Sequence, residues 1–299
     1  MPLSIGLITV RGPDYHPNRR LAQAAASRGL EVVLLDPYRL ACGLEGGLVV
    51  QGLPGGRLPR VILPRQGATL AEFCLLLLEQ MELAGARLVN SPRAVRLCSD
   101  QFRCLQILAA AGLPVPPSRQ VATPEAFDQA VEELGGVPLV AKRPAGRQGR
   151  GVSLLDGPEK LALARHFLLK RRRGLLLQGF IPPQGRRDLR LLMLGRELAA
   201  AVELEPPRGE FRANFHLGGR LAPFTPPAAV LDLARRAMQA LGLEIAGLDL
   251  VLDQQGRPWF LEANYAPGFK GLEAATGLDI AGRMLDHVAS IASSLERGR

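Results

Sequence analysis

The feature that most constrains this chain is a pair of apolar runs near its carboxyl end. Residues 248–252 and 259–263 are both of strand length, and the turn-forming sequence Asp-Gln-Gln-Gly separates them. Two such runs around a short polar turn predict a β-hairpin. Acidic residues interrupt the apolar pattern, because Asp249 lies in the first run and Glu262 in the second, with Asn264 two residues further on.

The position of these oxygen-bearing side chains suggests a metal site. If the four-residue turn sets the register, Asp249 lies opposite Phe260 and shares a sheet face with Glu262 and Asn264. A carboxylate among Leu, Val and Phe is costly to bury unless it is paired or bound to a cation. A set of oxygen ligands without His or Cys suits Mg²⁺, with Mn²⁺ as a substitute. The alternative is a surface hairpin whose acids are only solvated.

Length and composition indicate an ordinary globular protein. The 299 residues, 47% hydrophobic and 22% charged, are enough for two or three packed units. We expect no leader peptide and no membrane-spanning segment, since no run of about 18 apolar residues occurs. The four cysteines show no CxxC spacing and the four histidines are scattered, which argues against zinc and fits a reducing cytoplasm.

The formal charge of +9 predicts attraction to anions such as a nucleotide, an acidic peptide or nucleic acid. The densest basic run, residues 170–173, follows an apolar-periodic helix, where cations are favoured at the carboxyl end. Three Tyr and one Trp offer few surfaces for base stacking, which argues against direct binding to nucleic acid.

Residues 1–95 alternate between strand and helix patterns, which predicts an open α/β domain with a parallel sheet. No GxGxxG follows the first strand, so we expect substrate-facing loops there and no dinucleotide site. A helix is predicted over residues 100–111, with Ser99 as its N-cap. We place domain boundaries near residues 95 and 182, which gives a central unit over 96–182 and a carboxyl-terminal unit over 183–299.

A candidate phosphate-binding segment follows the strand predicted for residues 137–142. The strand ends on Lys142, and the glycine- and arginine-rich stretch 143–151 comes directly after it. Backbone N–H groups and cationic side chains of such a loop can close over phosphates, and Lys142 is placed to hold them as a point charge. A surface hairpin loop would look the same.

Two further segments have candidate ligand groups. The apolar strand 175–178 leads into residues 179–183, a type of segment that can form an adenine slot, although an ordinary core strand fits equally well. If residues 209–219 are extended, Arg212, Asn214 and His216 share one face, as Asp188 and Arg190 do in the strand before them. A solvated strand face is the default interpretation of such a pattern.

Together these segments resemble the ATP-grasp superfamily, and specifically the RimK-type α-L-glutamate ligases, over the whole chain. The most specific matches are DLRLLMLGRELAAAVE, GEFRANFHLGG, LGLEIAGLDLVL and WFLEANYAPGFKGLEAATGLDIAGRML, with LPRQG and VNSP nearer the amino terminus. The resemblance implies an α/β protein with α+β character in its carboxyl-terminal half. It implies an ATP-grasp fold in which residues 1–95 form an open α/β domain.

The resemblance also implies roles for individual residues. It places the metal ligands at Asp249, Glu262 and Asn264, and the substrate and acyl-phosphate contacts at Arg190, Arg212 and Asn214. The nucleotide-binding positions that it implies are Lys142, Gly146, Gln148, Gly149, Gly151, Gln178, Phe180, Ile181 and Asp188.

The chain departs from the family pattern at two informative positions. The lysine that usually follows Ser-Asp at the start of the central helix is replaced by Gln101, and the acid that usually follows the hinge glutamine is replaced by Gly179. Losing the cation should weaken ATP binding by about 1 to 3 kcal/mol unless another group replaces it. Arg103, Arg147 and Arg150 are candidates for that replacement.

The resemblance implies an ATP- and Mg²⁺-dependent carboxylate–amine ligase that acts through an acyl phosphate. The amine would be that of L-glutamate or a similar compound, and the acceptor a carboxylate of a protein carboxyl terminus or a small molecule. Relatives of this type also lead us to expect a cytoplasmic homo-oligomer. The alternative, motivated by Gln101 and Gly179, is a non-catalytic ATP-grasp relative that binds nucleotide or an acidic partner.

Overall fold

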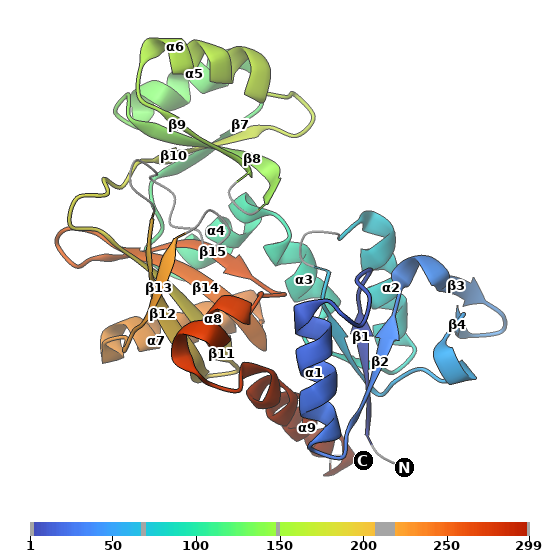
Figure 1. The fold of residues 1–299 in the computed structure, drawn as a ribbon. Helices are drawn as coiled ribbons and strands as arrows, with labels where there is room; N and C mark the ends of the chain where they lie inside the picture. Colours follow the sequence, from blue (N-terminus) through green and yellow to red (C-terminus); the bar gives the residue numbers. More distant parts are fainter. Residues whose placement is uncertain (1–2, 67–69, 148–149, 207–218, 298–299) are drawn as a thin grey trace.

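The computed structural model describes residues 3–66, 70–147, 150–206 and 219–297. These residues form three main sheets and one two-stranded hairpin (Figure 1). The amino-terminal and carboxyl-terminal sheets lie beside each other, and the middle sheet lies apart, above the carboxyl-terminal one in Figure 1. The α/β class and the mixed carboxyl-terminal half predicted from the sequence are confirmed.

The amino-terminal sheet is parallel, in the order β2-β1-β5-β6. Its strands are β1 (Ser4–Ile8), β2 (Glu31–Leu35), β5 (Val61–Pro64) and β6 (Arg87–Leu88), with helices α1 (His16–Ala26) and α2 (Glu72–Leu83). The hairpin of β3 (Ala41–Leu44) and β4 (Leu48–Gln51) leaves this sheet between its second and third strands. The strand–helix rhythm of the sequence therefore forms the parallel sheet that it predicts.

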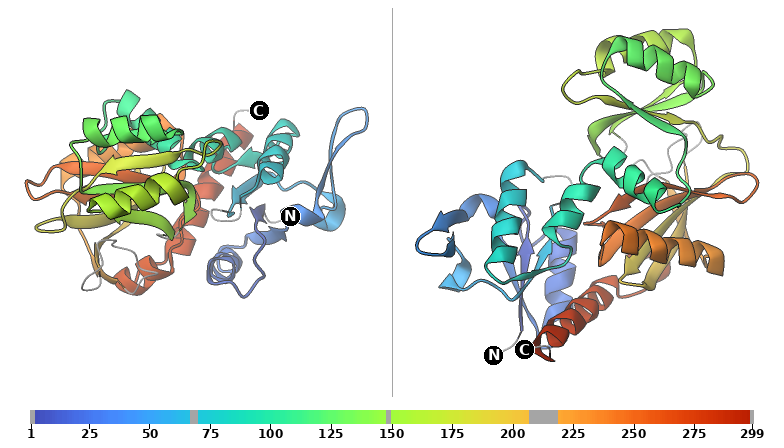
Figure 2. Two further views of the ribbon diagram at one scale, coloured as in Figure 1. Left: turned by 90° about the horizontal axis from the view of Figure 1, so that it is seen from above. Right: turned by 180° about the vertical axis from the view of Figure 1, so that it is seen from behind.

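The middle sheet is antiparallel, in the order β7-β10-β8-β9. Its strands are β7 (Ser118–Val121), β8 (Leu139–Arg147), β9 (Arg150–Leu155) and β10 (Leu175–Gly179). Helices α5 (Pro124–Glu133) and α6 (Pro158–Leu163) cover one face, as the two views in Figure 2 show. A separate apolar core that includes Phe127 and Leu177 lies between these helices and the sheet.

The carboxyl-terminal sheet is antiparallel, in the order β13-β12-β11-β14-β15. Its strands are β11 (Arg187–Leu194), β12 (Glu197–Glu205), β13 (Arg220–Pro223), β14 (Ile245–Leu252) and β15 (Pro258–Asn264), and its helices are α7 (Ala228–Leu241), α8 (Lys270–Thr276) and α9 (Ile280–Arg297). Buried residues of this sheet join those of the amino-terminal sheet in shared apolar clusters. These two sheets are therefore packed together, whereas the middle sheet has its own core.

The connection between residues 91 and 111 contains the helix predicted over residues 100–111 and, before it, a short helix that the sequence did not predict. It forms α3 (Pro92–Cys98) and α4 (Gln101–Ala110), so the N-cap predicted at Ser99 is wrong. The Ser99 hydroxyl donates back to the Arg96 carbonyl at 2.9 Å, whereas Asp100 accepts from the Arg103 N–H at 3.0 Å and caps α4. Aspartate is as good a cap as serine, and here it is the residue with extended backbone geometry.

Helix α4 packs against β15 and α7, so it lies on the carboxyl-terminal sheet although it precedes the middle sheet in the chain. The domain boundaries near residues 95 and 182 stay a prediction. Within the described ranges, no helix combines the length and apolar character needed to cross a membrane.

Candidate functional site

The β14–β15 hairpin has a different register from the one predicted. Asp249 pairs with Glu262 and not with Phe260, because Phe260 pairs with Leu250 and a β-bulge inserts Leu261 as an extra residue. The bulge makes Asp249 and Glu262 direct cross-strand neighbours. Asn264, which pairs with Gly247, lies two residues from Glu262 on the same strand face.

The turn of this hairpin is organised by one carboxylate. Asp253 accepts hydrogen bonds from the backbone N–H groups of Gln255 and Arg257 at 3.0 and 2.9 Å. It also accepts from Arg257 Nε at 2.8 Å and from Trp259 Nε1 at 3.1 Å. Burial alone would raise the pKa of Asp253, but these donors hold it down at about 2. A charged Asp253 therefore fixes the loop that precedes β15.

Asp249 forms a two-point ion pair with Arg190 of the neighbouring strand β11. Arg190 Nε lies 2.7 Å from Asp249 Oδ1, and Nη2 lies 2.6 Å from Oδ2. The two side chains are 26% and 23% exposed, so the pair is partly shielded from water. Asp249 raises the pKa of Arg190, which outweighs the opposing effect of burial. A parallel, charge-assisted pair of this kind holds both groups in a defined orientation.

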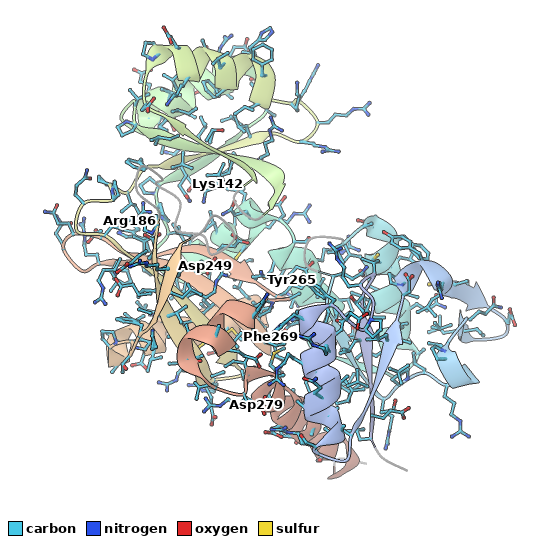
Figure 3. All side chains as sticks on the ribbon, in the orientation of Figure 1. Lys142, Arg186, Asp249, Tyr265, Phe269 and Asp279 are labelled. Atoms are coloured by element: carbon cyan, nitrogen blue, oxygen red, sulfur yellow. The ribbon has the colours of Figure 1, made fainter. Side chains whose placement is uncertain are left out.

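Lys142 of β8 belongs to the middle sheet, and Figure 3 shows it on the side that faces Asp249. Its side chain is 8% exposed. Burial lowers the pKa of Lys142 to about 8, and the carboxylates of Glu262 and Asp249 oppose that shift. The strand lysine therefore shares an electrostatic environment with the two hairpin acids, although it comes from another sheet.

Glu262 has a perturbed carboxyl group. Its side chain reaches solvent. Even so, its pKa is raised, mainly because the surrounding protein removes water from the carboxylate and secondly because Asp249 is negatively charged. The positive charges of Lys142 and Arg190 oppose this shift. Two carboxylates side by side disfavour each other's ionised form, and a divalent cation between them relieves that repulsion.

The donor set fits Mg²⁺ in its chemistry. Asp249 and Glu262 supply carboxylate oxygens, and Asn264 Oδ1, which accepts from the Ala266 N–H at 3.0 Å, retains a second lone pair. The described residues contain no group of three or more His, Cys, Asp or Glu side chains suited to a metal. The two-carboxylate, one-amide site thus stays a prediction.

The residues expected around the nucleotide base lie at the end of β10. Gln178 is 2% exposed, and its Nε2 donates to Ser118 Oγ at 3.0 Å. Phe180 and Ile181 follow and are half-buried. The Ile181 carbonyl accepts from Arg186 Nη1 at 2.8 Å, so a hydrogen bond connects this segment to the start of the carboxyl-terminal sheet.

Asp188 is partnered by Arg186, whose Nε lies 2.8 Å from Asp188 Oδ2 (Figure 3 labels Arg186). The side chains are 8% and 14% exposed, and burial raises the pKa of Asp188 in spite of the nearby guanidinium. The sequence analysis missed the pairing of Asp188 with Arg186, which lies just before β11, because Arg190 within the strand is also two positions from Asp188.

Among the remaining expected residues, Gly146 lies within β8 and Gly151 within β9, where Gly151 has a φ of 86°. That φ lies in the left-handed region, which favours glycine. Gln148, Gly149, Arg212 and Asn214 lie outside the described residues.

Gln101 has a role that the sequence did not reveal. Its Nε2 donates to the carbonyl of Leu261, the bulged residue, at 3.0 Å. The backbone N–H of the preceding Phe260 donates to the Pro114 carbonyl at 2.9 Å. Gln101 at the start of α4 and Pro114 after its end therefore both form hydrogen bonds to β15 at its bulge, next to Glu262.

An antiparallel middle sheet that carries a buried lysine, facing a second sheet with paired carboxylates on a hairpin, defines an ATP-grasp enzyme. The model of the RimK-like ATP-grasp domain matches residues 98–288. The chain belongs to this family, whose members are ATP-dependent ligases, and it is an ATP-dependent carbon–nitrogen ligase.

Similar proteins with curated names extend over nearly the whole chain. A protein of Stenotrophomonas maltophilia strain K279a named probable alpha-L-glutamate ligase is 35% identical over 291 residues, which covers 95% of this chain and 98% of that protein. A protein of the same name from Pseudoalteromonas translucida is 32% identical and covers 98% of this chain and 97% of its own length.

Solved structures give the same fold. The RimK domain ATP-grasp protein of Sphaerobacter thermophilus is 28% identical, with a TM-score of 0.71 and coverage of 96% of this chain and 99% of that one. The ATP-grasp ligase PsnB in complex with a minimal precursor is 23% identical, with a TM-score of 0.74 and coverage of 97% and 99%.

Proposed function

We propose that this protein joins the amino group of L-glutamate to a substrate carboxylate in an ATP- and Mg²⁺-dependent reaction. The observation that carries the proposal is the direct pairing of Asp249 with Glu262 on the side of the sheet that faces Lys142. The curated names of the relatives, which specify an alpha-L-glutamate ligase, support glutamate as the amine.

The residues would divide the work as follows. Lys142, with Gly146, Gln148, Gly149 and Gly151, would bind the phosphates, and Gln178, Phe180, Ile181 and Asp188 would bind the rest of the nucleotide. Asp249, Glu262 and Asn264 would hold Mg²⁺, or Mn²⁺ in its place, which when bound offsets phosphate charge. Arg190, Arg212 and Asn214 would contact the reacting carboxylate and its phosphorylated form.

The Arg190–Asp249 pair suggests how the chain prepares for this chemistry. Arg190 holds Asp249 at two points, so the carboxylate is oriented before a cation binds. The phosphoryl group of ATP would pass to the substrate carboxylate, and the amine would then displace phosphate to form the amide. Charge develops on the acyl oxygens in both steps, and a fixed guanidinium beside them stabilises it.

The acceptor carboxylate is the less defined substrate. PsnB, a structural neighbour, has a solved structure in complex with a precursor peptide. We propose that the acceptor here is a peptide carboxyl terminus or a small carboxylic acid, and the net charge of +9 favours an acidic one. We also propose that the protein acts as a homo-oligomer in the cytoplasm.

The alternative predicted from the sequence is a non-catalytic relative that binds nucleotide or an acidic partner, and membership of a family of ATP-dependent ligases argues against it. Its support is Gln101, which stands where a phosphate-binding lysine is usual and whose amide is committed to the Leu261 carbonyl. Against it also stands the direct pairing of Asp249 with Glu262, because neighbouring carboxylates repel each other unless a cation binds between them.

The test is ADP release by Glu262→Gln and Asp249→Asn with ATP, Mg²⁺, L-glutamate and a panel of carboxylic acids. Each substitution removes one carboxylate charge without changing side-chain size, so we expect turnover to fall at least 100-fold, or about 2.7 kcal/mol in the barrier. Exposed Glu132→Gln on the middle sheet's helix α5 is the matched control. Normal turnover in both site variants would contradict the metal assignment.

A further inference from the structure

A second group of polar side chains lies where β1 and β5 end and α1 begins. Among the described residues, six buried side-chain polar atoms have no hydrogen-bond partner. Five of them lie here: His16 Nδ1, Asn18 Oδ1, Arg65 Nε, and both Gln66 Nε2 and Gln66 Oε1. The sixth, His287 Nε2, lies 3.3 Å from a carboxylate oxygen of Glu244, so it has an ionic partner.

The five atoms belong to neighbouring side chains. The Arg65 N–H donates to the Ile8 carbonyl at 2.9 Å, which continues the β1–β5 pairing. Arg65 Cζ lies 5.8 Å from the centroid of the Phe269 ring, and the His16 ring lies 5.9 Å from the same centroid. Figure 3 shows Phe269 beside α1. Asn18 Nδ2 donates to the carbonyls of residues 11 and 12, in the loop that leaves β1.

Arg65 has a charge that this part of the protein does not neutralise. Its Nη2 donates to the Pro267 carbonyl at 2.8 Å, but none of its described neighbours is a carboxylate that pairs with it. Burial lowers the pKa of Arg65 to about 10, and only the phenol of Tyr15 opposes that shift. The nearby Glu273 is already paired with Arg20 at 3.0 Å.

The start of α1 adds to the preference for an anion. Tyr15 at the N-cap makes no side-chain capping bond, and the first turn has no acidic residue to offset the positive end of the helix dipole. Carboxyl ends of parallel strands followed by helix starts are where open α/β sheets bind ligands.

An ordered water could satisfy the amide of Gln66, but it would leave the guanidinium without a counter-charge. A phosphate monoester, which is mainly a dianion at neutral pH, would pair with Arg65 yet leave Asn18 Oδ1 and Gln66 Oε1, both acceptors, without a donor. A ligand that carries a carboxylate and an amino group offers acceptors to Arg65 Nε and Gln66 Nε2 and donors to Asn18 Oδ1 and Gln66 Oε1. Asn18 and Gln66 are each 1% exposed, so their positions are fixed by packing.

We propose that Arg65, Gln66 and Asn18 form the subsite that binds the amino-acid substrate of the ligase, with its carboxylate on Arg65 Nε and Gln66 Nε2. The proposal rests on the ligase function proposed above. Pro267, which Arg65 contacts, follows Asn264 by three residues, so their Cα atoms are no more than roughly 10 Å apart. The amino-terminal domain would therefore hold the amino group of the substrate near the edge of the metal site.

Calorimetric titration with L-glutamate tests the subsite without requiring turnover. We expect Arg65→Met and Gln66→Leu to weaken L-glutamate binding at least tenfold, because each removes a buried donor to a charged group. Arg57→Met, an exposed arginine that precedes β5 at its other end, should bind like the wild type. Inorganic phosphate is the second probe and should bind more weakly than L-glutamate.

Thermal unfolding of the free protein separates a binding role from a structural one. Gln66→Leu replaces a buried amide without partners by an apolar group, so its unfolding midpoint should equal or exceed that of the wild type. A lower midpoint, an Arg65→Met affinity within twofold of the wild type, absent L-glutamate binding, or tighter binding of phosphate would each overturn the subsite.

The two proposals can fail separately. If Arg65→Met abolishes L-glutamate binding while the wild type releases no ADP, the subsite stands and the ligase function falls. If L-glutamate stimulates ADP release and Arg65→Met leaves the KM for L-glutamate unchanged, the ligase function stands and the subsite falls.

Discussion

Asn90 connects the amino-terminal domain to the strands that carry the active site. Its Nδ2 donates to the carbonyls of Ile245 and Tyr265 at 2.7 and 2.8 Å. Its Oδ1 accepts from the N–H groups of Glu244 and Ile245 at 2.6 and 3.0 Å. The residue is 1% exposed. This one buried side chain therefore forms hydrogen bonds with backbone groups at the start of β14 and just beyond β15.

Asn90→Ala removes all four hydrogen bonds and leaves the backbone groups of Ile245 buried. At about 1 kcal/mol for each bond, the free energy of unfolding should fall by about 4 kcal/mol. For a chain of 299 residues, that loss corresponds to a decrease of roughly 6 °C in the thermal midpoint. ADP release should fall as well, because the anchored segments continue into Asp249 and Asn264.

Differential scanning calorimetry measures the midpoint, with Gln239→Ala, an exposed amide on α7, as the control. The control should unfold within about 1 °C of the wild type, since surface substitutions rarely exceed 0.5 kcal/mol. If Asn90→Ala unfolds within about 2 °C of the wild type, the four bonds do not stabilise this junction and the reasoning is refuted.

Three further perturbations test other contacts. Gln101→Ala loses the hydrogen bond to the Leu261 carbonyl, which is worth about 1 kcal/mol. It should lower kcat for ADP release about fivefold, with little change in the unfolding midpoint. An unchanged kcat would contradict this prediction. Asp253 has a folded pKa of about 2, below its ordinary value of 3.8, so its contribution to stability is present above pH 3.8 and is lost as the pH falls toward 2. Urea unfolding followed by fluorescence of Trp259, the single tryptophan, should show this loss, and Asp253→Asn should remove it. Arg20→Met breaks ion pairs of 3.0 Å with Glu273 on α8 and with Asp279 just before α9. The free energy of unfolding in urea should fall by about 1 kcal/mol at low salt and by less in 1 M salt. An equal loss at both salt concentrations would argue against an ionic origin.

The sequence predicted the elements that depend on local pattern. The alternation over residues 1–95 produced the parallel sheet, and the turn sequence after residue 252 produced the β14–β15 hairpin. Gly242 ends α7 with a φ of 65°, in the left-handed region where glycine is the usual residue at the end of a helix. These features follow from residues close together in the chain, so the chain itself contains the signal.

The register of the hairpin could not be predicted in the same way. The bulge at Leu261 is held by Gln101 and by the Pro114 carbonyl, which are more than 140 positions away in sequence. The pairing of Arg190 with Asp249 also depends on which strand neighbours β14. Sheet order and bulges are tertiary properties, so the identities of the acids were visible in the sequence but their partners were not.

The central claim is that ATP consumption is coupled to the formation of an amide with L-glutamate. The most direct measurement is ADP release by the wild type with ATP and Mg²⁺, with and without L-glutamate and each carboxylic acid, combined with mass spectrometry of the products. We predict that one acid gives L-glutamate-dependent ADP release together with an equal amount of a product heavier by one glutamate residue. ADP release without that product, or nucleotide binding without any ADP release, would contradict the account.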